Sequence, residues 1–87
     1  MVIYNMFVDP CHGWLKVKKS ELARIGIANK ISEYSYMRGD YAYIEQDCDL
    51  TLFMATKKKL NEPAELKCNE TDKYSKIRSY DRYVFEK

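Results

Sequence analysis

Residues 33–44 of this chain read EYSYMRGDYAYI and decide how its middle part folds. Tyrosines alternate with other side chains on both sides of an Arg38-Gly39 pair, a pattern typical of two antiparallel strands joined by a tight turn. Side chains of a strand point alternately to its two faces. The pattern therefore predicts a hairpin with four tyrosines on one face: Tyr34, Tyr36, Tyr41 and Tyr43.

The pairing of the two strands follows from the position of the turn. With Arg38 and Gly39 as a two-residue loop, Tyr36 is expected opposite Tyr41 and Tyr34 opposite Tyr43. Cross-strand aromatic pairs are worth roughly 0.2–1 kcal/mol each, which favours this register. The shared tyrosine face has two interpretations. Either it packs against a helix as core or, if exposed, it is a platform for a ligand.

The segment before the hairpin predicts two further strands. Residues Val2–Val8 are apolar or aromatic with one exception, and Asp9-Pro10 ends this first strand because proline lacks an N–H group. Residues 14–17 form a short second strand, with Trp14 as the expected anchor in the core. The first two strands are thus separated by a turn.

Two short helices are predicted. The first covers residues 21–25, with Ser20 as its N-cap. The second covers residues 50–60, and either Asp47 or Asp49 can cap it, since carboxylates are favoured at helix N-termini. The apolar side of this second helix is expected to cover the tyrosine face, through Leu50, Phe53 and Met54.

These elements define the fold class. An extended stretch over residues 64–68 and a tail over residues 75–87 complete the order of two strands, helix, hairpin, helix, strand and tail. The 87 residues leave room for one domain, 1–87. We predict an α+β fold with a small, mainly antiparallel sheet, a central tyrosine-rich hairpin and two short helices.

Charge and hydropathy limit the function classes. The net charge is +2 and the pI is about 8.4, below the value of ~9 that nucleic-acid-binding domains usually exceed. No apolar run approaches the ~18 residues of a membrane helix, and the first residues lack the pattern of a signal peptide. We therefore expect a cytoplasmic protein without a membrane partner, whose three cysteines are reduced.

The spacing of the reactive residues does not indicate a catalytic site or a metal site. The three cysteines and His12 lack the paired short spacings of zinc sites, so no metal and no cofactor is predicted. An enzyme would have to use His12 with a cysteine or with Asp47, and this is the least favoured alternative. The pair Asp47 and Asp49 is better explained by helix capping than by acid–base chemistry or Mg²⁺ binding.

A partner surface is predicted in the tail, where basic and aromatic residues alternate. Such residues are enriched at the centres of protein interfaces. The alternative is a terminal element packed by Ile77, Tyr80 and Val84, with its charges in water. The predicted binding residues are Arg78, Tyr80, Arg82 and Tyr83, with Trp14 if it is exposed. A nucleic-acid surface is the second alternative, with tyrosines as stacking platforms and basic residues at Lys16, Lys18, Lys19, Arg24 and 57–59.

Three motifs carry a resemblance to a known family: HGWLKV at 12–17, YSYMRGDYAYIEQDCD at 34–49, and SKIRSYDRY at 75–83. Together they resemble a family of small uncharacterised proteins carried by bacteriophages and bacterial mobile elements. The resemblance implies a phage-type accessory protein in the cytoplasm of a bacterial host, and supplies no catalytic or binding residues. We therefore expect a binding protein that inhibits or sequesters a host factor, in particular a host bacterial protein in counter-defence. The alternative is a small nucleic-acid-binding module, which a steep dependence of binding on salt would reveal.

Overall fold

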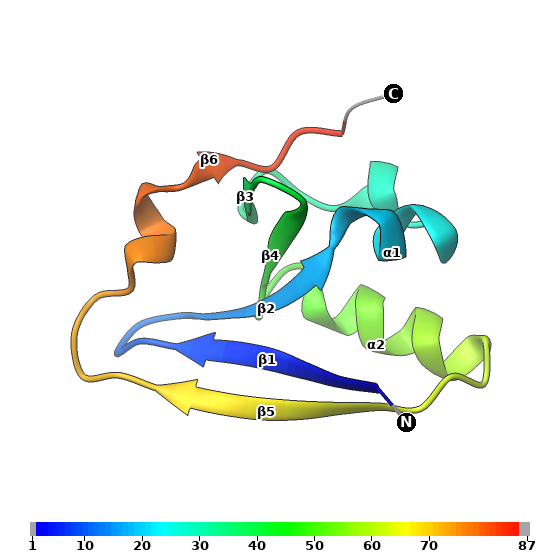
Figure 1. The fold of residues 1–87 in the computed structure, drawn as a ribbon, viewed down its shortest axis with the longest axis horizontal. Helices are drawn as coiled ribbons and strands as arrows, with labels where there is room; N and C mark the ends of the chain where they lie inside the picture. Colours follow the sequence, from blue (N-terminus) through cyan, green and yellow to red (C-terminus); the bar gives the residue numbers. More distant parts are fainter. Residues whose placement is uncertain (1, 86–87) are drawn as a thin grey trace.

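A computed structural model describes residues 2–85, which form a six-stranded sheet with two α-helices (Figure 1). The strand order is β5-β1-β2-β4-β3-β6; β1 and β5 are parallel, and the other neighbours are antiparallel. The predicted α+β fold is confirmed. The strands are β1 (Val2–Val8), β2 (Gly13–Lys18), β3 (Tyr36–Arg38), β4 (Tyr41–Glu45), β5 (Ala64–Glu70) and β6 (Asp81–Arg82). The helices are α1 (Lys19–Arg24) and α2 (Leu50–Lys59), with 3-10 turns η1 (Ala28–Lys30) and η2 (Lys76–Ser79).

The sheet is strongly bent, which separates its two ends. In Figure 1, β5 and β1 lie at the lower edge and β6 at the upper left, while α1 and α2 lie together at the right. The ladder between β1 and β2 is short, because it pairs only residues 6–8 with residues 13–15. Beyond it the two strands diverge. Within residues 2–85, neither helix has the length and apolar character needed to cross a membrane.

The hairpin forms, but its predicted register is wrong. Tyr36 pairs with Tyr43, and Arg38 pairs with Tyr41. The two-residue loop is therefore Gly39-Asp40, and Gly39 has a φ of 58°. A type II′ turn requires glycine at its first loop position, where an arginine would be strained. Each residue is therefore paired two positions away from its predicted partner. A shift of two residues does not change the face to which a side chain points, so Tyr36, Tyr41 and Tyr43 still share one face.

The main core lies on the face of the sheet that carries the helices. Alternate residues of β1, β2 and β4 point to this side, and α1 and α2 cover them with Leu22 and Phe53. Tyr83 enters the same core from the tail, and its hydroxyl donates a hydrogen bond to the carbonyl of Ala28 at 2.6 Å. The strand residues of this core are Tyr4, Met6, Leu15, Val17, Ala42 and Ile44.

The hairpin tyrosines lie on the opposite face, so their predicted packing against α2 is wrong. Alternation along β4 sends Ala42 and Ile44 toward the helices, and Tyr41 and Tyr43 must then point away. Tyr43 is buried in a second cluster with Trp14 and with Ile77 of η2. The partly buried members of this cluster are Phe7, Tyr36, Tyr41 and Tyr80.

The predicted caps of both helices are also wrong. Ser20 lies inside α1, which begins at Lys19 without a side-chain cap. Asp49 occupies the N-cap position of α2, but its carboxylate makes no capping bond. It accepts hydrogen bonds instead from the Ser32 hydroxyl at 2.7 Å and from the Ser35 hydroxyl. Asp49 thus ties the start of α2 to the segment before β3.

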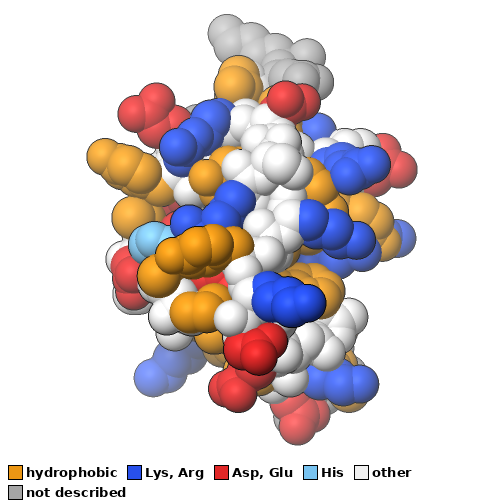
Figure 2. Space-filling model, turned by 90° about the vertical axis from the view of Figure 1, so that its left-hand side faces the viewer, with side chains coloured by type: hydrophobic (Ala, Val, Ile, Leu, Met, Phe, Trp, Pro, Cys, Tyr) orange, Lys and Arg blue, Asp and Glu red, His pale blue; other side chains and the backbone are white. Residues whose placement is uncertain are grey.

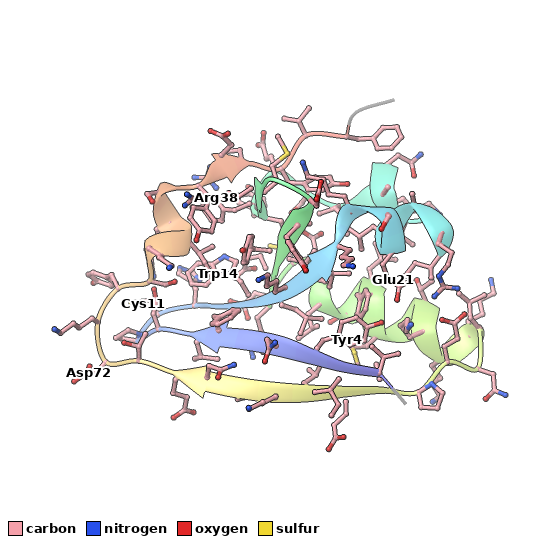
Figure 3. The ribbon with its side chains drawn as sticks, in the orientation of Figure 1. Tyr4, Cys11, Trp14, Glu21, Arg38 and Asp72 are labelled. Carbon is pink, nitrogen blue, oxygen red and sulfur yellow. The ribbon has the colours of Figure 1, made fainter. Side chains whose placement is uncertain are left out.

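A buried lysine joins α2 to α1 at the other end of the molecule. Lys57 is 2% exposed, and its Nζ lies 2.9 Å from Glu62 and 3.3 Å from Glu21. The Tyr4 hydroxyl donates to Glu21 at 2.7 Å, and Figure 3 shows these two side chains close to each other. Burial alone would lower the pKa of Lys57, but Tyr4 and the carboxylates raise it, so the ammonium form is favoured.

Candidate functional site

A cavity of about 350 Å³ lies on the side of the sheet opposite α1 and α2. β2, β3, β4 and the tail contribute to its walls, so it collects residues that are far apart in the sequence. Figure 2 views this end of the molecule and shows the single histidine, in pale blue, beside hydrophobic and basic side chains. The residues that line it are His12, Trp14, Tyr34, Tyr36, Glu45, Asp47, Cys48, Arg78 and Arg82.

Asp9 fixes two walls of this cavity to each other. Its fully buried side chain accepts hydrogen bonds from the backbone N–H groups of Cys11 at 3.0 Å and His12 at 2.9 Å, which shapes the turn before β2. The same carboxylate lies 2.7 Å from Nε of Arg78 and accepts the N–H of Ser75 at 3.1 Å. Arg78 and these backbone donors hold the pKa of Asp9 well below its usual range. Asp9 thereby anchors the tail to the first turn.

Arginine side chains lie over aromatic rings on this side of the sheet. The Cζ atom of Arg82 lies 4.9 Å from the ring centroid of Tyr36, and that of Arg38 lies 5.0 Å from the ring of Tyr80. Arg78 is placed between two rings, at 4.8 Å from Tyr74 and 5.4 Å from Trp14. Figure 3 shows Trp14 and Arg38 at the end of the molecule away from Tyr4 and Glu21. We call the group Tyr34, Tyr36, Arg38, Tyr74, Tyr80 and Arg82 the arginine–aromatic surface.

Two buried polar atoms beside the cavity have no hydrogen-bond partner within residues 2–85: Nε1 of Trp14 and Oε1 of Glu45. The other oxygen of Glu45, Oε2, accepts the backbone N–H groups of Asp47 at 2.9 Å and Cys48 at 3.0 Å. Glu45 is 6% exposed, and Oε1 lies 3.4 Å from Nδ1 of His12. A buried polar atom without a partner costs free energy and needs an explanation.

The predicted binding residues fall into different environments. Trp14, Arg78 and Arg82 all line the cavity, but Trp14 is only 2% exposed and Arg78 is bound to Asp9. Tyr80 packs on the ring of Tyr43 with 5.1 Å between centroids. Tyr83 does not join the cavity, because it belongs to the main core. Arg82 thus combines solvent exposure with a place in the cavity wall.

The tyrosines of the predicted platform also separate. Tyr34 and Tyr36 line the cavity, and Tyr34 is 59% exposed. Tyr43 is buried in the second cluster. Tyr41 lines another groove, where Nζ of Lys16 lies 4.2 Å from its ring centroid.

The cysteines are free thiols exposed to solvent. Cys48 lines the cavity close to Glu45. Desolvation raises the pKa of the Cys48 thiol, and the carboxylate of Glu45 raises it further. This environment disfavours the thiolate that nucleophilic chemistry with His12 would require.

Four site residues are not predicted from the sequence: Asp9, Arg38, Glu45 and Tyr74. Asp9 stands before Pro10 and was interpreted only as the end of a strand, although an aspartate there commonly accepts backbone N–H groups of a following turn. No local sequence pattern indicates that Glu45 is buried or belongs to a site. Its burial depends on the pairing of β4 with β2, which places it opposite Trp14.

The chain was compared with models of protein families, with curated proteins and with solved structures, and no match was found in any of the three. The protein is therefore classified by its fold and its cavity. It is a small α+β domain with one apolar face under α1 and α2 and one aromatic, arginine-bearing face with a cavity.

Proposed function

We propose that this chain is a binding protein that inhibits or sequesters a factor of a bacterial host, and that it recognises a host protein through the arginine–aromatic surface. The observation that carries the proposal is that Arg38 and Arg82 each lie over a tyrosine ring, with 5.0 Å and 4.9 Å between Cζ and the ring centroid. Arginine and tyrosine are enriched among the residues that dominate binding energy in protein interfaces. The resemblance to phage proteins supports a partner in the bacterial cytoplasm.

The chemistry of this surface favours an acidic partner. A guanidinium group stacked on a ring keeps the N–H groups along its edge, and these can donate to carboxylates in pairs. Because each guanidinium group already lies over a ring, its side chain has fewer conformations to lose on binding. Arg38 and Arg82 are both exposed and are the expected contacts.

The variants for a test have to spare the fold. Arg78 is unsuitable, because its loss would leave the buried carboxylate of Asp9 without its cation. We choose the double variant Arg38→Ala with Arg82→Ala. The matched control is Lys58→Ala with Lys59→Ala, which removes the same charge from exposed residues near the end of α2.

The experiment begins with capture of a partner from a bacterial lysate, with and without nuclease. Calorimetric titration of the isolated partner then gives the dissociation constant, and circular dichroism confirms that each variant is folded. We expect the arginine variant to bind about 30-fold more weakly or worse, since an interface hot spot contributes about 2 kcal/mol or more. The lysine control should bind like the original chain. Equal affinity of both variants would place the interface elsewhere.

A nucleic-acid-binding module is the second candidate, and a different groove favours it. Where β1 and β2 diverge, a groove of about 550 Å³ is lined by Lys16, Lys18 and Arg24 together with Tyr41. Basic side chains beside an aromatic ring suit a single strand of nucleic acid. Arg24, however, is bound to Glu62 and Glu21, whereas Lys16 and Lys18 form no ion pair with any residue in the range 2–85. Binding that weakens steeply with salt, and that Lys16→Ala with Lys18→Ala abolishes, would favour this candidate over the first.

A further inference from the structure

His12, Glu45 and Asp47 bring three potential metal ligands together at the cavity. One imidazole nitrogen and one oxygen from each carboxylate all lie within 4.8 Å of one another. They come from the turn before β2, the end of β4 and the turn after β4. Their sequence separation explains why no ligand motif is visible in the chain.

The distance between His12 and Glu45 fits a metal ion. Nitrogen and oxygen ligands bind Zn²⁺ at about 2.0–2.2 Å, which places two neighbouring ligand atoms roughly 3.0–3.5 Å apart. Nδ1 of His12 and Oε1 of Glu45 are 3.4 Å apart, within this range. Asp47 is exposed, so its side chain is free to rotate toward the other two.

The carboxylate of Glu45 provides the second and independent observation. Its Oε2 is held by two backbone N–H groups, which fixes the orientation of the whole carboxylate. Its Oε1 is buried, points into the cluster and has no hydrogen-bond partner within residues 2–85. A buried anionic oxygen is normally paired or coordinates a metal. His12 approaches it at 3.4 Å, a distance too long for a good hydrogen bond.

From these observations we propose that His12, Glu45 and Asp47 bind one divalent transition-metal ion of the Zn²⁺ or Mn²⁺ type at the wall of the cavity. An imidazole suits zinc and its neighbours, and carboxylates suit manganese as well. Three protein ligands leave at least one coordination position open, as in zinc sites that also bind water or a substrate. The site does not depend on the proposed host partner.

The ordinary alternative is an ion pair between protonated His12 and Glu45, without a metal. The two alternatives predict opposite responses to a titration with Mn²⁺ alone. A metal site binds the ion with saturation and releases protons, and its affinity falls on acidification because protons compete for the ligands. An ion pair alone gives neither response.

The test uses the chain after treatment with a chelator, titrated with Mn²⁺ in a calorimeter and by NMR. His12 is the only histidine, so its ring signals need no further assignment. Paramagnetic Mn²⁺ bound at this site should broaden them at substoichiometric concentrations. Zn²⁺ should displace the Mn²⁺ and restore the sharp signals, in line with its higher affinity for such ligands.

Two variants remove ligands with little risk to the fold. In Glu45→Gln the amide oxygen can still accept the N–H groups of Asp47 and Cys48, while an NH₂ group replaces the free oxygen. Asp47→Asn changes an exposed side chain. We expect each variant to weaken Mn²⁺ binding by about tenfold or more, since even outer-shell partners of metal ligands contribute about 10–100-fold.

The control is Asp72→Asn, which removes the same charge from an exposed residue outside the cavity. It should bind Mn²⁺ like the original chain, as should Cys48→Ser. Equal affinity of Glu45→Gln and Asp72→Asn would overturn the proposal, as would Mn²⁺ binding without broadening of His12. Loss of binding in Cys48→Ser would overturn the ligand set, and a titration without saturable binding would leave the ion pair as the explanation of the cluster.

Discussion

The two faces of the sheet are built from the same strands but differ in chemistry. β4 shows the contrast within one segment: Ala42 and Ile44 point to the helices and are fully buried among apolar groups, while Tyr41 and Tyr43 point to the other side. The helix-covered face is closed by Phe53 and Leu22, both fully buried. On the other face, Ile77 and Tyr80 of the tail pack against Trp14 and Tyr43.

The difference between the faces indicates how stability and recognition are divided. On the helix face, buried polar groups are satisfied, as with the Tyr83 hydroxyl on Ala28. On the other face, Trp14 and Glu45 keep buried polar atoms without partners among the described residues. Places where a sequence departs from the usual rules of packing are often functional. We therefore assign stability chiefly to the first face and propose that binding uses the second.

Replacing Phe53 by Ala should have the largest effect on stability. Phe53 is fully buried and its ring meets Tyr4 edge-on, with 5.2 Å between centroids. Such a truncation should lower the free energy of unfolding by about 3–5 kcal/mol, measured by chemical denaturation. A loss below about 1 kcal/mol would show that α2 does not close this face, and the division between the faces would fail.

Replacing Arg78 by Ala should have the next largest effect, because it tests whether the second face depends on Asp9. In the original chain the pKa of Asp9 is lowered, so its contribution to stability is present above its ordinary value near 3.8 and is lost as pH falls through the lower folded value. In the variant the charged carboxylate is uncompensated. The difference in unfolding free energy between the two proteins should therefore be greatest at neutral pH and shrink toward pH ~3.

Unfolding midpoints in denaturant, measured from neutral to acidic pH, give this comparison. Asp9→Asn combined with Arg78→Ala is the control, because it removes the buried charge together with its partner and should show a weaker dependence on pH. If the single variant loses the same stability at every pH, the Asp9–Arg78 pair does not anchor the tail.

Replacing Gly39 by Ala should have an intermediate effect and tests the register of the hairpin. Gly39 has a φ of 58°, and an added Cβ would meet no atom within 4 Å, so the cost is conformational. We expect a loss of about 1 kcal/mol. Arg38→Ala is the control and should change stability by less than about 0.5 kcal/mol, as is usual at exposed positions. Equal effects would mean that the turn lies elsewhere.

Replacing Tyr34 by Ala should have the smallest effect on stability. Tyr34 is 59% exposed, so its truncation should change the free energy of unfolding by less than about 0.5 kcal/mol. Binding of a partner at the arginine–aromatic surface should nevertheless weaken, since exposed tyrosines are frequent interface anchors. A large loss of stability would instead assign Tyr34 to the core of the second face.

Part of the fold could be predicted from local patterns. The apolar run Val2–Val8 is β1, and residues 14–17 lie within β2. The second helix ends within one residue of the predicted boundary, because its apolar spacing and the following Asn61-Glu62-Pro63 act locally. The caps failed for a different reason: Asp49 and Ser20 have the right residue types, but contacts with Ser32 and Ser35 outcompete capping for Asp49.

The sequence by itself determined the order of the elements, the alternation that keeps Tyr36, Tyr41 and Tyr43 on one face, and the basic and aromatic character of the tail that includes Arg82. These depend on periods of two residues, on turn formers and on charge, which act over short distances. The tertiary structure alone decided which face the helices cover and which polar groups are buried. In the structure, β4 pairs with β2 and Glu45 lies beside His12. Arg78 binds Asp9, from which it is separated by 69 positions in the sequence. Such contacts arise from the global arrangement of strands, for which a single sequence carries no local signal.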